Sequence, residues 1–185
     1  MVKLPDNAKC VFKGVMFDVY QWQQEMFDGS FQTFEAIKRL PSVQIIAVTK
    51  DKKIVMQKES QPFMGTYTAI PGGRVDRGSG YEETAKNELL EETGMKAENW
   101  FLWCEKQVGS KVIWPTYYYI AKGCELIQGI QNGEGERTET IPVSFNEFFR
   151  LAQSENFKNK QLSDMLFRIQ QDEEKLHEFK SLLFE

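Results

Sequence analysis

Three glutamates near the middle of the chain, Glu88, Glu91 and Glu92, could together bind a divalent metal ion. Glu91 and Glu92 follow Glu88 by three and four positions, so on a helix the three carboxylates share one face and repel one another. Gly94 is a typical residue after a helix end, which would put Glu91 and Glu92 in the last turn, where each acid costs roughly 0.3–1 kcal/mol against the helix dipole. A divalent cation removes this cost, because Mg²⁺ prefers clustered oxygen ligands.

An acidic, solvated helix face without a metal is the alternative, and the flanking residues bear on it. The segment Pro71-Gly72-Gly73 precedes a helix that we predict from about Gly80 to Thr93. The spacing resembles the Nudix box, which is a glycine, five residues, a glutamate, seven residues and then Arg-Glu-aliphatic-x-Glu-Glu-x-Gly-aliphatic. The matching residues are Gly73, Glu88, Leu89, Glu91, Glu92, Gly94 and Met95. Ser79 replaces the first glutamate and Asn87 the arginine.

The resemblance to Nudix hydrolases implies an α/β fold, an α/β/α sandwich with a mixed sheet, which the order of predicted strands and helices also favours. It further implies that Mg²⁺, with Mn²⁺ as an alternative, is bound by Glu88, Glu91, Glu92 and the carbonyl of Gly72. Such a metal would neutralise a pyrophosphate and orient a water molecule, and Glu92 is therefore also counted among the catalytic residues. Gly73 and Arg74 are expected to contact the substrate.

Residues 34–43, FEAIKRLPSV, narrow the resemblance to the ADP-ribose pyrophosphatase subfamily. In that subfamily an N-terminal hairpin packs on the sister subunit, and the nucleotide base is held between subunits. The resemblance therefore implies a homodimer with Trp22 or Phe27 near the base, although Trp22 could instead only stabilise the hairpin. Arg39 and Lys58 are the expected cations for the phosphates or ribose. The run Trp114 to Tyr119 is interpreted as core strand in preference to a ligand platform.

A catalytic base is also required, and the resemblance places it on a late loop, here residues 133–139, GEGERTE. A base must come within hydrogen-bond reach of the attacking water. Glu136 is the first candidate, Glu134 the second and Glu139 the third. The alternative is that these acids are ordinary residues of an exposed loop.

The chain is predicted to consist of residues 1–41, an N-terminal hairpin that serves for dimerisation, and residues 42–185, a Nudix domain with C-terminal helices. The hairpin runs from Lys9 to Lys38 and turns at Asp28-Gly29. Ser79 and Glu82 are predicted to form a capping box at the start of the acidic helix. Further strands are expected at 43–48, 54–57, 66–70, 100–107 and 112–121, a loop at 128–140, and helices at 145–153 and about 161–183.

Composition limits the other function classes. Over 185 residues the net charge is −4, and no basic stripe is visible, so we expect neither nucleic acid nor an anionic membrane as a partner. Three cysteines without a CxxC motif and no apolar leader favour a cytoplasmic protein. His177 is the only histidine and is expected at the surface, which argues against a Ser-His-Asp triad.

Three functions remain open from the sequence. The first is Mg²⁺-dependent hydrolysis of the pyrophosphate bond in a nucleoside diphosphate derivative, with ADP-ribose or a related nucleotide sugar as first candidate. The second is a housecleaning hydrolase for a nucleoside triphosphate, which the long N-terminal hairpin disfavours. The third is a catalytically weak or inactive nucleotide-binding module. Ser79 and Asn87 favour this last function, whereas the intact set of three glutamates opposes it.

Overall fold

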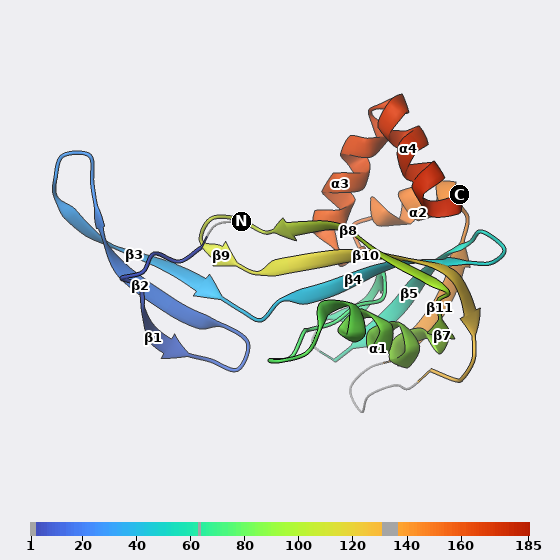
Figure 1. Ribbon diagram of the computed structural model, residues 1–185, viewed down its shortest axis with the longest axis horizontal. Helices are drawn as coiled ribbons and strands as arrows, with labels where there is room; N and C mark the ends of the chain where they lie inside the picture. Colours follow the sequence, from blue (N-terminus) through green and yellow to red (C-terminus); the bar gives the residue numbers. More distant parts are fainter. Residues whose placement is uncertain (1–2, 63, 131–136) are drawn as a thin grey trace.

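A mixed sheet of seven strands forms the middle layer of the molecule, seen in a computed structural model that describes residues 3–62, 64–130 and 137–185 (Figure 1). The order is β11-β5-β4-β10-β7, with β6 paired to β5 and β8 to β10. Among the described pairings within this sheet, only the central β4–β10 pairing is parallel. The strands are β4 Ser42–Thr49, β5 Ile54–Gln61, β6 Gly65–Ala69, β7 Met95–Lys96, β8 Asn99–Gln107, β10 Pro115–Leu126 and β11 Arg137–Val143.

Helices cover both faces of this sheet, so the predicted α/β/α sandwich is confirmed. Helix α1 Tyr81–Thr93 lies on one face, and α2 Phe145–Ala152, α3 Lys160–Gln170 and α4 Glu173–Phe184 lie on the other (Figure 1). Alternate residues of β4 serve the two layers: Ile45 packs with Leu89 of α1, whereas Ile46 packs with Phe148 and Leu162. None of the helices in the described ranges has the length and apolar content needed to cross a membrane.

A second, smaller sheet extends away from the sandwich (Figure 1). Its order is β1-β2-β3-β9, with β1 Lys9–Lys13, β2 Asp18–Glu25, β3 Phe31–Lys38 and β9 Val112–Ile113. The predicted turn at Asp28-Gly29 is confirmed, with Gly29 at a φ of 80°. The prediction of a two-stranded hairpin was incomplete, because the chain turns again between β1 and β2, and β9 adds a parallel strand from the sandwich domain.

Two other predictions at the C-terminal end were wrong. The expected helix over 161–183 is two helices, because the Asp172 side chain accepts a hydrogen bond from the Lys175 amide at 3.2 Å and starts α4 anew. The expected loop over 128–140 includes the start of β11, which pairs with β5 from Arg137 onward. His177 is exposed, as expected.

The ends of α1 fix the position of the acidic residues, and one end differs from the prediction. Gly94 follows the helix with a φ of 70°, and its amide donates to the Leu90 carbonyl, as expected for a left-handed cap. At the other end Gly80, not Ser79, is the N-cap, and no side chain caps the helix. The amide of Ser79 donates to the Asp76 carbonyl at 3.2 Å within the preceding turn, so the predicted capping box is wrong.

We therefore expect Ser79→Ala to leave the free energy of unfolding within about 0.5 kcal/mol of the wild type. Ser144→Ala is the matched control, because the Ser144 hydroxyl accepts from the Glu147 amide at the start of α2. It should cost about 1 kcal/mol. Urea unfolding followed by circular dichroism measures both. A loss of about 1 kcal/mol in Ser79→Ala would mean that Ser79 caps α1 after all.

Candidate functional site

A glycine turn joins the acidic helix to the sheet. The Val43 amide donates to the Gly73 carbonyl at 2.9 Å, and the Ile45 amide donates to the Pro71 carbonyl at 2.8 Å. This pairing brings the turn so close to β4 that a Cβ on Gly72 would overlap the Val43 carbonyl oxygen. On the other side of the turn, a Cβ on Gly73 would overlap the carboxylate of Glu88. Glycine is thus required at position 72 by close approach to backbone, whereas a side chain at position 73 would displace the Glu88 carboxylate.

Glu92 is the carboxylate that the fold holds most firmly. Its Oε2 accepts hydrogen bonds from the Gly72 amide at 2.9 Å and from Gln57 Nε2 at 3.2 Å. Burial raises the pKa of Glu92 to about 8. The Gly72 hydrogen bond lowers it, the charges of Glu88 and Glu59 raise it further, and the Gln57 hydrogen bond lowers it. The ionised form of Glu92 therefore lacks a compensating positive charge.

The other two predicted ligands lie on the same helix and differ in exposure. Glu88 is half-buried against the glycine turn, whereas Glu91 is exposed. Within the described residues, no three Asp, Glu, His or Cys side chains converge closely enough to bind a metal together. The three carboxylates nevertheless fit a hard cation, because Mg²⁺ prefers oxygen ligands. The raised pKa of Glu92 is consistent with this, since it indicates that no positive charge compensates the ionised carboxylate.

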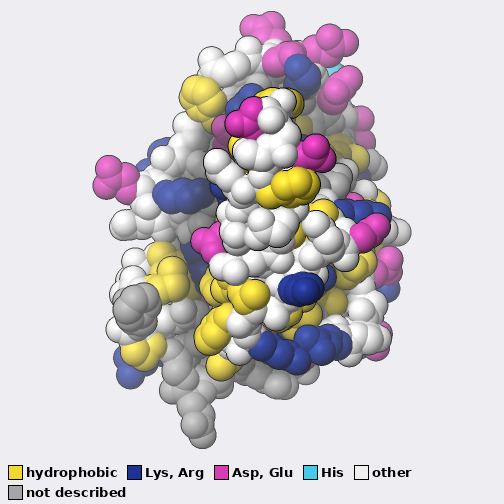
Figure 2. Space-filling model, turned by 90° about the vertical axis from the view of Figure 1, so that its left-hand side faces the viewer, with side chains coloured by type: hydrophobic (Ala, Val, Ile, Leu, Met, Phe, Trp, Pro, Cys, Tyr) yellow, Lys and Arg dark blue, Asp and Glu magenta, His cyan; other side chains and the backbone are white. Residues whose placement is uncertain are grey.

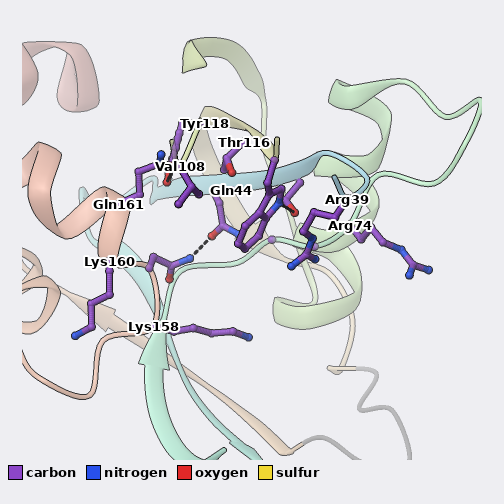
Figure 3. Close-up of a pocket in the computed structure, with 14 residues that line it drawn as sticks. Arg39, Gln44, Arg74, Val108, Thr116, Tyr118, Lys158, Lys160 and Gln161 are labelled. Atoms are coloured by element: carbon purple, nitrogen blue, oxygen red, sulfur yellow. Dashed lines mark hydrogen bonds between the residues drawn. The ribbon is translucent and has the colours of Figure 1, made fainter. Parts of the chain in front are cut away.

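A cavity of about 390 Å³ lies beside the glycine turn (Figure 3). Gly72 and Gly73 form part of its wall, so the turn separates the cavity from the acidic face of α1. Cationic and amide side chains make up much of the remaining lining, which is Arg39, Ser42, Gln44, Arg74, Val108, Trp114, Thr116, Tyr118, Lys158, Asn159, Lys160 and Gln161. Such a set suits an anionic ligand with hydrogen-bonding groups.

Arg39 is held in this wall by aromatic rings. Its guanidinium lies 3.9 Å from the centroid of Trp114 and 5.6 Å from that of Phe17, which positions its charge through cation–π contacts. Its Nε is buried and has no hydrogen-bond partner among the described residues. Burial and the nearby charge of Arg74 lower the pKa of Arg39. Arg39 and Arg74, both predicted from the sequence to contact the substrate, thus contribute to the lining of one cavity.

The interpretation of the run Trp114 to Tyr119 as core strand is confirmed for Tyr118 and Tyr119, which are buried in the two core clusters, but the run also contributes to the cavity. Tyr119 lies in the core on the α1 side, as expected. Trp114, Thr116 and Tyr118 line the cavity, and Trp114 donates to the Ser42 hydroxyl at 2.9 Å. The strand therefore contributes side chains both to the core and to the cavity, because alternate side chains lie on its two faces.

Within a single chain, several residues predicted for the site lie away from the cavity, and the prediction that Trp22 or Phe27 contacts a base held between subunits stays a prediction. Trp22 lies in a separate surface hollow with Lys9 and Thr33, and Phe27 is fully exposed at the tip of the β2–β3 turn. Lys58 is exposed and pairs in register with Glu139, on the face of β5 opposite to Gln57 and Glu59. Glu139 is therefore directed away from Glu92. The leading candidates for the base, Glu134 and Glu136, lie outside the described residues.

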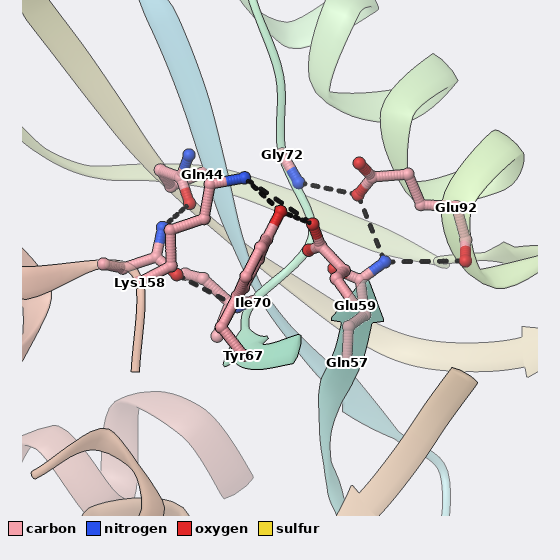
Figure 4. A network of polar contacts seen from close by, with 9 residues as sticks. Gln44, Gln57, Glu59, Tyr67, Ile70, Gly72, Glu92 and Lys158 are labelled. Atoms are coloured by element: carbon pink, nitrogen blue, oxygen red, sulfur yellow. Dashed lines mark hydrogen bonds and ion pairs between the residues drawn. The ribbon is translucent and has the colours of Figure 1, made fainter. Parts of the chain in front are cut away.

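A polar network that the sequence did not suggest connects the two halves of the site (Figure 4). It contains buried Gln57 and Glu59 on β5, the Tyr67 hydroxyl on β6, and Lys158 and Asn159 before α3. The Asn159 amide donates to Gln44 and accepts from the Ile70 amide. One signal was available in the sequence. Gln57 and Glu59 come after the apolar residues of the same strand and alternate with Lys58, which indicates two polar side chains on one buried face.

Comparison with known proteins gives the family. The model of the NUDIX domain matches residues 38–165. An ADP-ribose pyrophosphatase of Bacillus subtilis (strain 168) is 36% identical over 89 residues, which are 48% of this chain and 48% of that protein. The alignment thus spans about half the length of this relative.

Two further similarities extend over more of the chain. A methanol dehydrogenase activator of Bacillus methanolicus is 27% identical over 143 residues, which cover 74% of this chain and 76% of the relative. A solved structure described as an ADP compounds hydrolase superimposes with a TM-score of 0.72 and covers 92% of this chain and 95% of that one. At 18% sequence identity this superposition shows a shared fold.

The raised pKa of Glu92 leads to a stability prediction. Between pH 4.5, its ordinary pKa, and about pH 8 the unfolded chain loses this proton while the folded chain keeps it, so rising pH lowers the free energy of unfolding of the metal-free wild type by about 1.4 kcal/mol per pH unit. Glu92→Gln removes this effect. Its melting temperature should match the wild type near pH 4.5 and exceed it by several degrees at pH 8 and above.

Glu91→Gln is the control, because Glu91 is exposed and its loss should change metal-free stability by less than about 0.5 kcal/mol. Adding Mg²⁺ should raise the melting temperature of the wild type more than that of Glu92→Gln. Differential scanning calorimetry in EDTA and in Mg²⁺ measures both effects. Equal pH profiles for the wild type and Glu92→Gln would contradict the raised pKa.

Proposed function

This chain belongs to the Nudix family, and from that membership we propose that it hydrolyses the pyrophosphate bond of a nucleoside diphosphate derivative. ADP-ribose or a related nucleotide sugar is the first candidate substrate. The relative from Bacillus subtilis, which is named an ADP-ribose pyrophosphatase, supports this choice over the matched half of the chain. The reaction is attack of water on phosphorus, with AMP as the expected nucleotide product for an ADP derivative.

One observation carries the proposal: the acidic end of α1 meets a cation-lined cavity at a single glycine turn. The Gly72 amide binds Glu92 on one side of the turn, and Gly72 and Gly73 line the cavity on the other. A diphosphate in the cavity would thus have carboxylates on one side of it and Arg39 and Lys158 on the other. This separation suits a metal-bound pyrophosphate, because the metal and the cations share its negative charge.

The residues of the chain take the following roles. Glu88, Glu91 and Glu92 would hold Mg²⁺ or Mn²⁺ together with the Gly72 carbonyl, and the metal would supply charge neutralisation and an activated water. The Gly72 amide and Gln57 orient the carboxylate of Glu92. Arg39 binds phosphate oxygens from the Trp114 side of the cavity. Glu136, followed by Glu134, is proposed as the base.

A binding module that no longer hydrolyses is the second candidate, and one observation favours it. The carboxylates of the described residues do not converge into a metal site, and Asn87 stands where the box has an arginine that could orient them. An asparagine there offers only a neutral hydrogen bond in place of a charge pair. Hydrolysis by the wild type would exclude this candidate.

The test is a panel of nucleoside diphosphate derivatives and nucleoside triphosphates with Mg²⁺, read by release of nucleoside monophosphate. We expect turnover of ADP-ribose or a nucleotide sugar, loss of turnover in EDTA, and a decrease of at least about 100-fold in kcat for Glu92→Gln and for Glu91→Gln, since each removes a metal ligand. Wild-type rates in both variants would exclude the proposed metal site. Binding of ADP-ribose without hydrolysis of any panel member would favour the binding module.

We further propose that the protein is a homodimer joined through the β1-β2-β3 sheet. Its apolar side chains are exposed, among them Val11, Phe12 and Phe31, and a small sheet without a covering layer is marginal in water. Viewed from this end, the molecule shows hydrophobic side chains gathered beside Lys and Arg (Figure 2). Phe12 and Phe31 share one face, because Phe12 pairs with Val19 and Val19 with Ile37 of the Phe31 strand.

Light scattering after gel filtration should therefore report about twice the chain mass of 21.5 kDa. Phe12→Gln combined with Phe31→Gln should shift the particle towards the monomer, because it places two polar groups in a buried interface. Phe167→Gln is the control: Phe167 is 52% exposed on α3, away from this sheet, and the dimer should persist. A wild-type mass of 21.5 kDa at micromolar concentration would rule the dimer out.

A further inference from the structure

Lys158 is fixed beside the cavity by its backbone. The Lys158 amide donates to the Thr68 carbonyl at 2.9 Å, and the Thr68 amide donates to the Asn156 carbonyl at 2.9 Å. These bonds attach the segment before α3 to β6, and fully buried Phe157 anchors it from within. The position of Lys158 therefore does not depend on contacts of its own side chain.

The Lys158 ammonium nevertheless has two polar partners from the sheet (Figure 4). It donates to the Tyr67 hydroxyl at 2.9 Å and lies 3.5 Å from Glu59 Oε2. The Tyr67 hydroxyl donates to the same Glu59 oxygen at 2.7 Å. Glu59 is only 8% exposed and Tyr67 only 6%, so this acid–phenol pair is buried while the Lys158 side chain reaches the cavity.

We infer that Lys158 is a substrate-binding residue whose ammonium contacts a phosphate oxygen of the nucleoside diphosphate, and that Glu59 and Tyr67 hold it at the cavity wall. The ligand class in this inference rests on the proposed function. An ammonium has three N–H donors. One donates to the Tyr67 hydroxyl, and Glu59 lies at ion-pair distance, which leaves donor capacity for an anion in the cavity.

A purely structural ion pair explains the arrangement less well. The segment is already held by backbone hydrogen bonds and Phe157, and a buried ion pair adds little stability compared with apolar residues of the same size. The neighbouring cations differ from Lys158. Lys160 donates to the carbonyls of Ser154 and Glu155, and Arg74 pairs with Asp76 at 3.2 Å in an exposed position.

The test measures binding of ADP in metal-free buffer by titration calorimetry at low and high salt. Lys158→Gln should raise the Kd by about tenfold or more, because it removes a charged hydrogen bond, and should make the Kd less sensitive to salt. The same variant should lower the melting temperature, because Glu59 stays buried without its cation. Lys175→Gln is the control: it removes a surface lysine that pairs with Asp172 on α4, and it should bind ADP as the wild type does.

The double variant Glu59→Gln with Lys158→Gln separates binding from stability. A glutamine at position 59 can still accept the hydrogen bond from Tyr67, so the melting temperature should recover while the affinity for ADP stays low. Recovery of both would overturn the inference in favour of a structural role, as would wild-type affinity in Lys158→Gln or no binding of ADP by the wild type. Loss of affinity in Lys158→Gln, together with no hydrolysis of any panel member by the wild type, would refute the proposed function and keep the inference.

Discussion

The hydrogen bond from the Gly72 amide to the Glu92 carboxylate is the interaction on which the site depends. It joins two segments that are 20 positions apart and sets the distance between the end of α1 and the glycine turn. The turn can lie this close to β4 only because Gly72 lacks a Cβ, which would overlap the Val43 carbonyl oxygen, and a Cβ on Gly73 would displace the Glu88 carboxylate. Substituting Gly72 would therefore displace the cavity wall, and substituting Gly73 would displace a carboxylate.

The same interaction explains why polar residues are buried on β5. Gln57 supplies Glu92 with a second hydrogen-bond donor. Two residues further along the same face of β5, Glu59 accepts a hydrogen bond from Tyr67 and pairs with the Lys158 ammonium. These donors satisfy the two carboxylates, whereas Gln57 Oε1 is buried without a hydrogen-bond partner among the described residues. These contacts place a residue before α3 in the same site as a helix on the other face of the sheet, while the apolar residues on the two faces form separate clusters.

Much of the fold could be predicted from the sequence, because periodicity and turn residues are local signals. The sandwich, the strand that contains Ile45 and the Gly94 helix end follow from them. The errors lie where tertiary context decides between similar local signals. Ser79 and Gly80 can both begin a helix, and the turn bond from the Ser79 amide to Asp76 decides for Gly80. Lys158 could not be placed from the sequence. Its segment reaches the site by pairing with Thr68 of β6, and neither segment has a sequence pattern that indicates this partner.

The N-terminal sheet and the cavity are physically connected, which bears on why this chain keeps an extension outside the sandwich. Arg39 follows directly after β3, and its guanidinium lies between Phe17 of the β1–β2 turn and Trp114 at the start of the β10 segment. The Arg39 amide in turn donates to the Ile113 carbonyl of β9 at 3.2 Å. Phe17 thus links the small sheet to Arg39 in one wall of the cavity. The N-terminal sheet therefore contributes to the position of Arg39 in the site. A second subunit packed on this sheet would further restrict the orientation of the Arg39 side chain.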